Sequence, residues 1–425
     1  MDKGSTYEVR DLKLAEQGRK NITWAESQMG ALLHIRERFG RQKPFAGIMI
    51  GMALHVTKET AVLVRTLVAG GAKVAITGCN PLSTQDDVAA ALAEEGKDGS
   101  IAIYAHKGES KEDYYRYLNM VISQRPQMTI DDGCDLISEI HLRHPEIIPD
   151  LIGGCEETTT GVIRLKAMER DGALRYPIVA VNDNKTKHLL DNYYGTGQST
   201  IDGILRGTSI LIAGKTVVVV GYGSCGKGVS LRAHGLGANV IVTEVNAFRA
   251  LQAKLDGFRV MPMVQAAPLG DIFVTVTGNK HVITLEHMQM MKHGAIVANS
   301  GHFDAEVDYA GLRNFATQVH EIRPLVEEFQ LPSGRRIIAL GQCRLVNLAL
   351  AEGHPSEVMS TSFCGQALAC EYLVQQKGKL KPGVLVLPES IDEEIAQLQL
   401  VALGVEIDIL TDEQRKYLTS WQEGT

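Results

Sequence analysis

The chain has 425 residues, which is enough for two or three domains with sizeable cores. Its 43 basic and 50 acidic side chains give a net charge of -7, so the charge does not favour nucleic acid or an anionic membrane as the main partner. Seven cysteines without a Cys-x-x-Cys pair are typical of a reduced cytoplasmic protein without a structural zinc site. We find no signal peptide and no apolar run long enough for a membrane span, so neither is expected.

Apolar runs alternate with helical periodicity through the first part of the chain. The pattern predicts helices at 15–39, 59–69 and 112–123 and strands at 47–54, 73–77, 101–104 and 128–131. Strands that alternate with helices are typical of a parallel sheet that is covered on both faces.

A second α/β unit begins near residue 196. It is predicted to contain a helix at 226–234 and strands at 215–220, 239–243, 271–275, 295–299 and 336–340, and helices at 357–376 and 391–403 follow it. We expect the segment after this unit to return to the first unit. The predicted fold is therefore α/β, with two doubly wound, Rossmann-like domains: 1–190 joined by 354–390, then 191–353, and a short C-terminal helical segment, 391–425.

A glycine-rich turn, Gly221-Tyr-Gly-Ser-Cys-Gly-Lys-Gly228, joins the strand at 215–220 to the next helix. This context supports dinucleotide binding, because the glycines permit a tight turn and the helix start supplies amide donors for a pyrophosphate. Glu244 ends the next strand, where a carboxylate can accept both ribose hydroxyls of NAD, while Arg249 could soften a preference against NADP. Lys227 is either a solvated residue of the first helical turn or a phosphate contact.

Polar side chains also follow strands of the first unit, at the edge where open parallel sheets bind ligands. His55, Thr57 and Glu59 follow the strand at 47–54, and Asp131 ends the strand at 128–131. Each of these residues alone is explained as well by a helix cap, a turn or a buried histidine.

Two further stretches, Glu156 to Gly161 and 182–192, concentrate acids, lysines, threonines and amides near the expected domain crossing. Such a mixture in a cleft favours proton transfer to a hydroxyl or a carbonyl. No histidine and carboxylate pattern with the spacing of metal ligands occurs, so no metal is expected.

Taken in order, these stretches resemble the S-adenosylhomocysteine hydrolases over nearly the whole chain. The most specific matches are Ser83 to Asp86, Glu156 to Gly161, Asp191 to Ser199, Gly301 to Asp304 and Gly353 to Ser356. The chain is similar to the shorter bacterial and archaeal form, since it lacks the C-terminal Lys and Tyr that longer members lend to a neighbouring subunit.

The resemblance implies a homotetramer in which tightly bound NAD oxidises the 3′ carbon of a nucleoside ribose. The ketone acidifies the 4′ C–H, a base removes that proton, the 5′ substituent leaves, water adds, and the hydride returns. The implied reaction is reversible hydrolysis of S-adenosyl-L-homocysteine to adenosine and homocysteine, with residues 191–353 binding NAD and the first domain binding the nucleoside.

The resemblance also assigns roles to individual residues by position. The catalytic residues would be His55, Asp131, Glu157, Lys187 and Asp191. Lys187 and Asp191 would act at the 3′ hydroxyl, and a base at Lys187 requires a pKa well below that of an ordinary lysine. Thr57 and Glu59 would read the purine edge, with His302 and His354 closing the pocket. The NAD contacts would come from Thr158, Thr159, Thr160, Asn192, Gly221, Gly223, Ser224, Cys225, Gly226, Lys227, Gly228, Glu244, Arg249, Ser300, Gly301 and Asn347.

The chain departs from the family pattern in a few places. Gly341-Gln342-Cys343 replaces Ala-Glu-Gly, which would remove a carboxylate and add a side chain beside the nucleoside, and Asn246 and Ser224 also differ. These changes are either neutral or signs of another ligand. Three alternatives therefore stay open: an inosyl thioether as substrate, a nucleoside dehydratase that stops after elimination, and a non-enzymatic NAD sensor. The intact catalytic set argues against the sensor.

Overall fold

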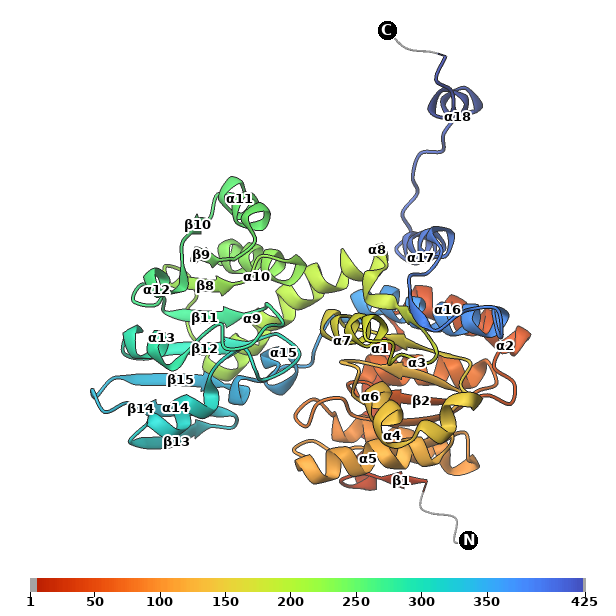
Figure 1. Cartoon of the computed structure of the whole chain (residues 1–425), viewed down its shortest axis with the longest axis horizontal. Coiled ribbons are helices and arrows are strands. Elements are labelled where there is room, and N and C mark those ends of the chain that lie inside the picture. The colour runs from red at the N-terminus through yellow and green to blue at the C-terminus, as the bar shows by residue number, and fades with distance from the viewer. Residues whose placement is uncertain (1–5, 423–425) are drawn as a thin grey trace.

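The computed structural model describes residues 6–422 and divides most of them between two α/β domains that lie side by side (Figure 1). The first domain is built on an eight-stranded, wholly parallel sheet of order β1-β4-β3-β2-β5-β6-β7-β16. Its strands are β1 (Tyr7–Glu8), β2 (Met49–Ala53), β3 (Lys73–Thr77), β4 (Ile101–Tyr104), β5 (Met128–Asp131), β6 (Gly153–Glu156), β7 (Pro177–Ala180) and β16 (Gly383–Leu385).

Helices cover both faces of this sheet. They are α1 (Ala15–Glu26), α2 (Gly30–Gln42), α3 (Lys58–Ala69), α4 (Asp86–Glu95), α5 (Lys111–Ser123), α6 (Asp135–Arg143), α7 (Thr159–Arg170), α8 (Lys185–His188), α16 (Ser356–Gln375) and α17 (Glu389–Ala402). The helix expected at 15–39 is two helices, because the chain turns between Glu26 and Gly30. Gly30 also lies so close to α17 that an added Cβ would be 2.8 Å from the Ala402 Cβ.

The second domain has a sheet of order β10-β9-β8-β11-β12-β15-β14-β13, in which β13, β14 and β15 form an antiparallel edge. Its strands are β8 (Thr216–Val220), β9 (Asn239–Thr243), β10 (Arg259–Val260), β11 (Ile272–Thr275), β12 (Ala295–Asn299), β13 (Gln318–Arg323), β14 (Val326–Gln330) and β15 (Arg336–Leu340). Its helices are α9 (Thr196–Thr208), α10 (Ser224–Gly235), α11 (Ala247–Leu255), α12 (Met263–Ala266), α13 (Leu285–Met290), α14 (Tyr309–Phe315) and α15 (Val346–Ala349).

Strand β8 shows why an unbroken apolar run becomes a central strand. Val217 and Val219 face one core of the second domain, whereas Val218 and Val220 face the core on the other side of the sheet. A strand that is buried on both faces needs apolar side chains at every position rather than at alternate positions.

After residue 353 the chain returns to the first domain. The strand β16 adds to β7, and α17 packs on α2 and α16 with Ile395 in the first-domain core. The boundary expected at 391 therefore falls inside a first-domain helix. Beyond it, α18 (Asp412–Thr419) projects away from both domains (Figure 1).

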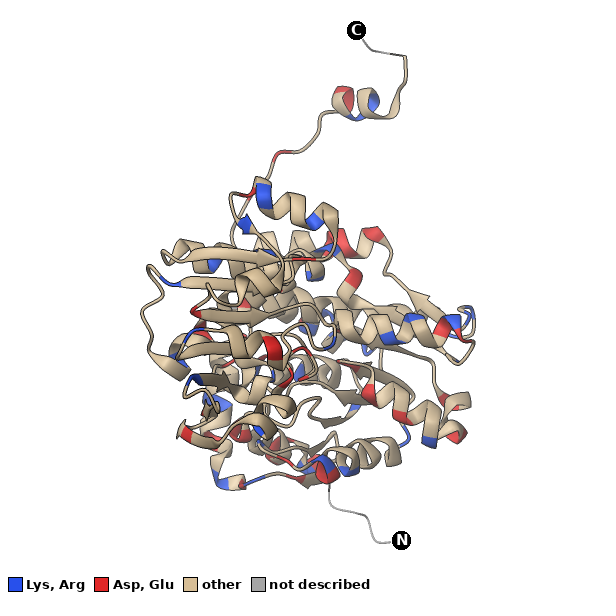
Figure 2. Ribbon diagram, turned by 60° about the vertical axis from the view of Figure 1, so that its left-hand side comes forward, with Lys and Arg blue, Asp and Glu red and all other residues tan. Residues whose placement is uncertain are grey.

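Basic and acidic side chains alternate over both domains without a large region of one sign (Figure 2). Within residues 6–422, none of the helices has both the length and the apolar character that a membrane crossing requires.

Near the middle of each sheet the strand order reverses from descending to ascending, and ligands bind beside such a point in open α/β sheets. In the first domain the reversal lies between β2, which is followed by His55, and β5, which ends at Asp131 and is followed by Asp132. In the second domain it lies between β8 and β11, where the glycine turn begins at Gly221.

Candidate active site between the two domains

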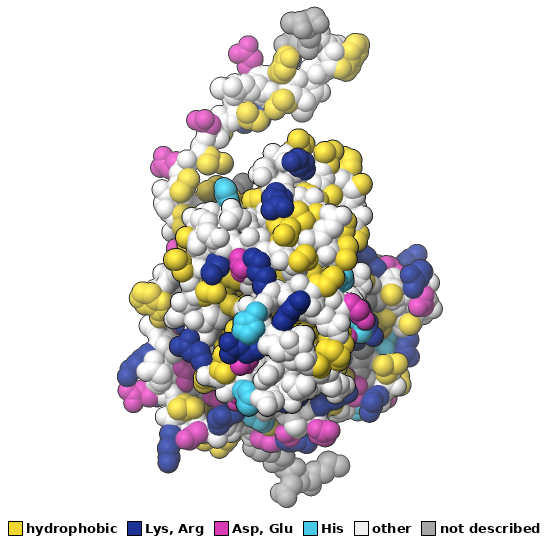
Figure 3. All heavy atoms as spheres, turned by 90° about the vertical axis from the view of Figure 1, so that its left-hand side faces the viewer, with side chains coloured by type: hydrophobic (Ala, Val, Ile, Leu, Met, Phe, Trp, Pro, Cys, Tyr) yellow, Lys and Arg dark blue, Asp and Glu magenta, His cyan; other side chains and the backbone are white. Residues whose placement is uncertain are grey.

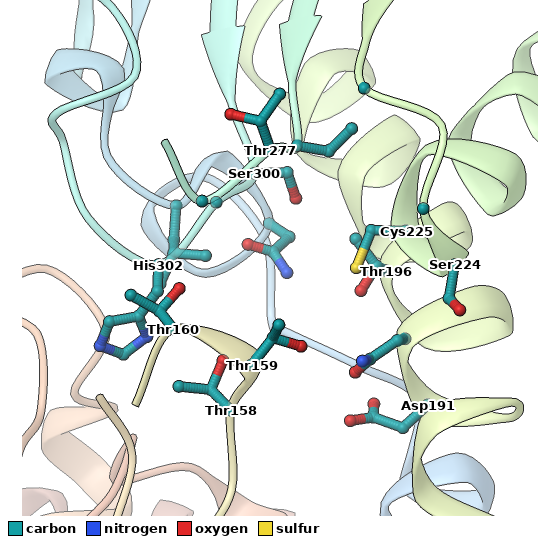
Figure 4. A pocket seen from close by; sticks show the side chains of 18 of the residues that line it. Thr158, Thr159, Thr160, Asp191, Thr196, Ser224, Cys225, Thr277, Ser300 and His302 are labelled. Carbon is teal, nitrogen blue, oxygen red and sulfur yellow. The ribbon is translucent and has the colours of Figure 1, made fainter. Parts of the chain in front are cut away.

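One cavity of about 1020 Å³ joins the two reversal points. Residues of the first domain, including His55 and Glu157, and residues of the second, including Gly223 and Ser300, line it together. Figure 4 shows Thr158, Thr159 and Thr160 on one side of this space and Thr277 and Ser300 on the other.

The glycine turn forms the second-domain wall. Gly221 has a φ of +104° and lines the cavity with Gly223, Ser224, Cys225 and Lys227. Gly226 and Gly228 act through packing instead, because an added Cβ would lie 2.0 Å from the Gly221 carbonyl oxygen or 1.9 Å from that of Tyr193. The turn thus brings the start of α10 to the cavity.

Glu244 lies beside this turn and its carboxylate is held by backbone donors. Tyr222 N–H donates to Oε2 over 2.8 Å, while Val245 and Asn246 N–H donate to Oε1. Arg249 lines the cavity nearby, with Nη1 3.8 Å from the position of a Cβ on Gly223. The Lys227 ammonium lies 6.0 Å from the Tyr222 ring centroid and also faces the cavity, so Lys227 is not purely a solvent-facing residue.

The protein provides hydrogen-bond donors and acceptors where the nicotinamide end of a bound dinucleotide would lie. Asn347 lines the cavity; its amide donates to Ser199 Oγ, and its buried Oδ1 has no hydrogen-bond partner among residues 6–422. Thr158 precedes α7 at the N-cap position, but its side chain accepts no hydrogen bond from the first turn, so its hydroxyl is not used as a cap. These groups, with Ser300 and Gly301, can hold a carboxamide and ribose hydroxyls, and the site therefore fits NAD.

Lys187 lies at the centre of the first-domain wall. Its ammonium is 2.7 Å from Asp191 Oδ2, 3.7 Å from Glu157 Oε1, and donates to Asn192 Oδ1 over 2.7 Å. Asp191 also bonds His354 Nδ1. Asp191 and Asn192 begin a short π-helical turn, Asp191–Gly195, a local irregularity that is frequent at functional sites.

The side chains of this cluster do not by themselves supply the lowered pKa that a base at Lys187 requires. Burial opposes the ammonium, but Asp191 and Glu157 outweigh it and raise the pKa of Lys187 above the ordinary value. Burial also opposes ionisation of Asp191, yet His354 and Lys187 lower the pKa of that carboxyl. Without a ligand, Lys187 is therefore an ammonium held by two acids rather than a free base.

Glu157 is the carboxyl group of this cluster whose pKa lies near neutral pH. Burial raises the pKa of Glu157 to about 7, against the opposing effect of Lys187. Ser362 Oγ donates to its Oε1 and the Gln366 amide donates to Oε2 over 2.5 Å, both from α16. The sequence interpretation missed these two residues, because nothing in an apolar helix marks which polar side chains will face the site.

Asp131 does not have the position that the sequence interpretation assigned to it. Its carboxylate is fully buried outside the cavity lining and accepts from the N–H groups of Asp132 and Ile137 over 2.9 and 2.8 Å. Asp132 lines the cavity instead. The error has a simple cause: neighbouring residues at a strand end point in opposite directions, so only one of two successive acids can face the ligand.

Asp132 meets two histidines at the far end of the cavity. His55 Nε2 lies 3.5 Å from Asp132 Oδ2, and His302 Nδ1 lies 3.4 Å from Asp132 Oδ1. His55 Nδ1 is itself 2.7 Å from Ser83 Oγ. Burial lowers the pKa of His55 to about 4, so its imidazole is neutral at pH 7 and can accept a proton.

The end that would read the purine is formed by α3 and α16. Thr57 and Glu59 line the cavity, but Thr57 also caps α3 by accepting from Thr60 N–H. Glu59 Oε1 accepts from Ser356 Oγ over 2.6 Å and lies 3.4 Å from Lys58 Nζ. Further lining residues that the sequence interpretation missed are His188, Thr196, Met359 and Phe363.

Of the departures from the family pattern, Gln342, Cys343 and Asn246 do not line the cavity, whereas Ser224 does. Gln342 is exposed and Cys343 is buried in the second-domain core, and neither lines the cavity, so the expected change beside the nucleoside is wrong. Asn246 caps α11 by accepting from Arg249 N–H. Ser224 contacts His188 Nε2 over 3.0 Å.

Comparison with known proteins agrees with the site. Residues 6–149 match the family model described as S-adenosyl-L-homocysteine hydrolase, and residues 192–353 match the model of its NAD binding domain. The chain is 57% identical to the S-inosyl-L-homocysteine hydrolase of Methanocaldococcus jannaschii, over 99% of this chain and 100% of that protein. It is 56% identical to an adenosylhomocysteinase of Thermosynechococcus vestitus (99% and 97% covered) and 57% identical to one of Aquifex aeolicus (99% and 100% covered). The chain belongs to the S-adenosyl-L-homocysteine hydrolase family and is an enzyme of that family which uses NAD.

Proposed function

We propose that this enzyme hydrolyses S-adenosyl-L-homocysteine reversibly to adenosine and homocysteine. The observation that carries the proposal is that the glycine turn and the Lys187–Asp191 pair face one cavity from opposite domains. NAD bound there would supply the hydride acceptor and donor that the reaction needs. The proton transfers of the reaction would be carried out by side chains of the protein.

Lys187 and Asp191 are suited to bind the ribose 3′ hydroxyl, because they can donate to it and accept from it at once. A cationic ring beside Lys187 would oppose its ammonium and help it give up a proton. Glu157, with a pKa of about 7, can hold the neighbouring hydroxyl and exchange a proton with Lys187 across 3.7 Å.

At the other end, Asp132 and neutral His55 can take the 4′ proton and protonate the leaving sulfur. Assigning these steps to Asp132 rather than Asp131 follows from the cavity lining. His302 of the second domain lies beside Asp132, and His354, in the segment that returns to the first domain, lies beside Asp191. Each end of the site is therefore closed by a histidine.

The purine base of the substrate distinguishes two hydrolyses, since one relative is described as an S-inosyl-L-homocysteine hydrolase. Glu59 favours adenine, because a buried carboxylate accepts from the 6-amino group and repels the 6-oxo group of hypoxanthine. Purified enzyme should release thiol faster from the adenosyl thioether than from the inosyl one. If neither releases thiol while nucleosides still reduce the bound NAD, the enzyme is a nucleoside dehydratase instead.

We further propose a cytoplasmic homotetramer. Hydrophobic side chains gather over α11 on the second domain (Figure 3), where Val245 and Phe248 are exposed, and Ile409 and Trp421 are exposed in the C-terminal segment. Apolar surfaces of this kind support assembly with other copies. Light scattering should give four chains per particle, and a monomer would refute this part of the proposal.

A further inference from the structure

We propose that Glu156 is a positioning residue that sets the spacing between the carboxyl groups of Asp132 and Glu157. Glu156 ends β6, is fully buried and does not line the cavity. Glu157 and Thr158, which follow it, do line the cavity, as does Asp132, which follows the neighbouring strand β5. The inference rests on the proposed function, in which Asp132 and Glu157 act at different carbons of the same ribose.

One oxygen atom of Glu156 joins the two loops that carry these acids. Its Oε1 accepts from Gly133 N–H over 2.9 Å and from Thr158 N–H over 3.0 Å. Gly133 directly follows Asp132, and Thr158 directly follows Glu157. Each acid is therefore one peptide unit away from a donor to the same oxygen, so a shift of the Glu156 carboxyl group would move both acids.

The surroundings hold this carboxyl group and its loop in place. A Cβ on Gly161, in the first turn of α7, would lie 2.1 Å from Glu156 Cδ, so the helix packs directly on the carboxyl group. Gly133 has a φ of +105°, and a Cβ there would lie 2.3 Å from His302 Nε2 of the second domain. The Gly133 carbonyl oxygen accepts from Arg164 of α7. Glu156 can therefore act as a fixed spacer between the two loops.

The geometry also indicates that Glu156 is a neutral carboxylic acid. Glu156 and Asp131 lie opposite each other on neighbouring strands and are both fully buried, and within residues 6–422 neither forms an ion pair, since Arg164 pairs with Asp135. Two such carboxyl groups retain a proton between them. Both oxygens of Asp131 accept from backbone N–H groups, whereas Glu156 Oε2 has no partner in the described part of the chain, so the proton belongs on Oε2. In agreement, burial and then Asp131 and Asp132 raise the pKa of Glu156 well above its ordinary value.

Substitutions at Glu156 separate the effect of position from that of charge. Glu156→Gln keeps an oxygen that accepts from both N–H groups and puts an N–H donor in place of the O–H, so rates should stay within about threefold of wild type. Glu156→Asp keeps the acid but is shorter by one methylene group and cannot reach both donors, so kcat should fall by about 100-fold with little change in KM. Glu156→Met has no acceptor oxygen and should behave like Glu156→Asp, which keeps the test decisive where the aspartate variant does not fold.

Adenosine with deuterium at C4′ is the probe, and rates are expressed per folded, NAD-loaded chain. Reduction of the bound NAD reports on the Glu157 end of the site, and loss of deuterium to the solvent reports on the Asp132 end. Glu139→Asp is the matched control, because Glu139 is a buried acid of α6 that bonds Asn119 outside the cavity lining. It should leave both rates unchanged.

Two results would overturn the proposal. Wild-type rates in Glu156→Asp or Glu156→Met would show that the position of this carboxyl group does not matter. A Glu156→Gln variant as slow as Glu156→Asp would make Glu156 a proton-transfer group instead of a spacer. Neither rate requires thiol release, so a wild-type enzyme that shows both rates but does not hydrolyse the thioether would refute the proposed hydrolysis alone.

Discussion

The two walls of the cavity offer different kinds of groups to a ligand. The second-domain wall offers backbone at Gly221 and Gly223, together with Asn347, whose Oδ1 has no hydrogen-bond partner within the described part of the chain. The first-domain wall carries buried charges, Lys187 and Asp191, that already satisfy one another. A buried charge without a partner is far more costly than a free amide, so proton-transfer groups must be paired before a ligand arrives.

The largest effect on activity is expected from removing the charge of Lys187 in the first-domain wall. Lys187→Met should slow nucleoside-driven reduction of the bound NAD by about 10³-fold, since a positioned acid–base group contributes roughly 10²–10⁴-fold. NAD should stay bound, because its contacts lie mainly on the other wall. Rapid-mixing absorbance of the reduced cofactor measures the rate. Lys185→Met is the control, as Lys185 lies on the same helix α8 but is exposed and pairs with Glu389. A wild-type rate in Lys187→Met would remove Lys187 from the mechanism.

The next largest effect, on NAD binding and stability, is expected at the glycine turn of the second-domain wall. Gly226→Ala places a Cβ 2.0 Å from the Gly221 carbonyl oxygen, so we expect loss of NAD binding and about 2 kcal/mol lower stability. Gly235→Ala, in the last turn of the same helix, places a Cβ with no atom of the described residues within 4 Å and should raise stability by about 0.5–1 kcal/mol. Thermal unfolding and NAD titration test both variants, and equal behaviour of the two would refute the packing argument.

A third prediction uses the lowered pKa of His55. The unfolded chain binds the His55 proton below about pH 6.5, whereas the folded enzyme binds it only below about pH 4. Stability that is present above pH 6.5 is therefore lost as the pH falls through this window. His55→Gln should reduce this loss by on the order of 2 kcal/mol in denaturant titrations. An unchanged pH dependence would show that His55 is as easily protonated when folded.

The smallest effect is expected at the crossing between the walls. Glu352 bonds Lys58 of the first domain and Arg206 of the second, both at 2.9 Å, but its side chain is 57% exposed. Glu352→Gln should change the KM for nucleoside by about threefold, since exposed ion pairs contribute less than about 1 kcal/mol. Glu286→Gln, an exposed acid on α13, should change nothing. A tenfold effect would mean that this link controls domain closure.

The sequence alone located most of the fold and most of the site. The four strands that flank the reversal points, β2, β5, β8 and β11, were predicted within two residues at each end. Apolar runs that are bounded by turn residues predict buried strands well. The segments β6 and β7 and the hairpin β13–β14 were missed, since they are short or carry polar side chains on an edge. A turn of three residues at Ser27 to Met29 divided a helix whose periodicity is nearly continuous.

The order of residues along the chain determined which chemistry is present: a glycine turn after a buried strand, an acid after the next strand, and lysine four residues before aspartate. Only the tertiary structure decided between Asp131 and Asp132, joined Ser362 and Gln366 to Glu157, and raised rather than lowered the pKa of Lys187. The reason is physical: sequence spacing sets which groups share a strand end, but burial and charge depend on what the other domain and α16 bring within a few ångströms.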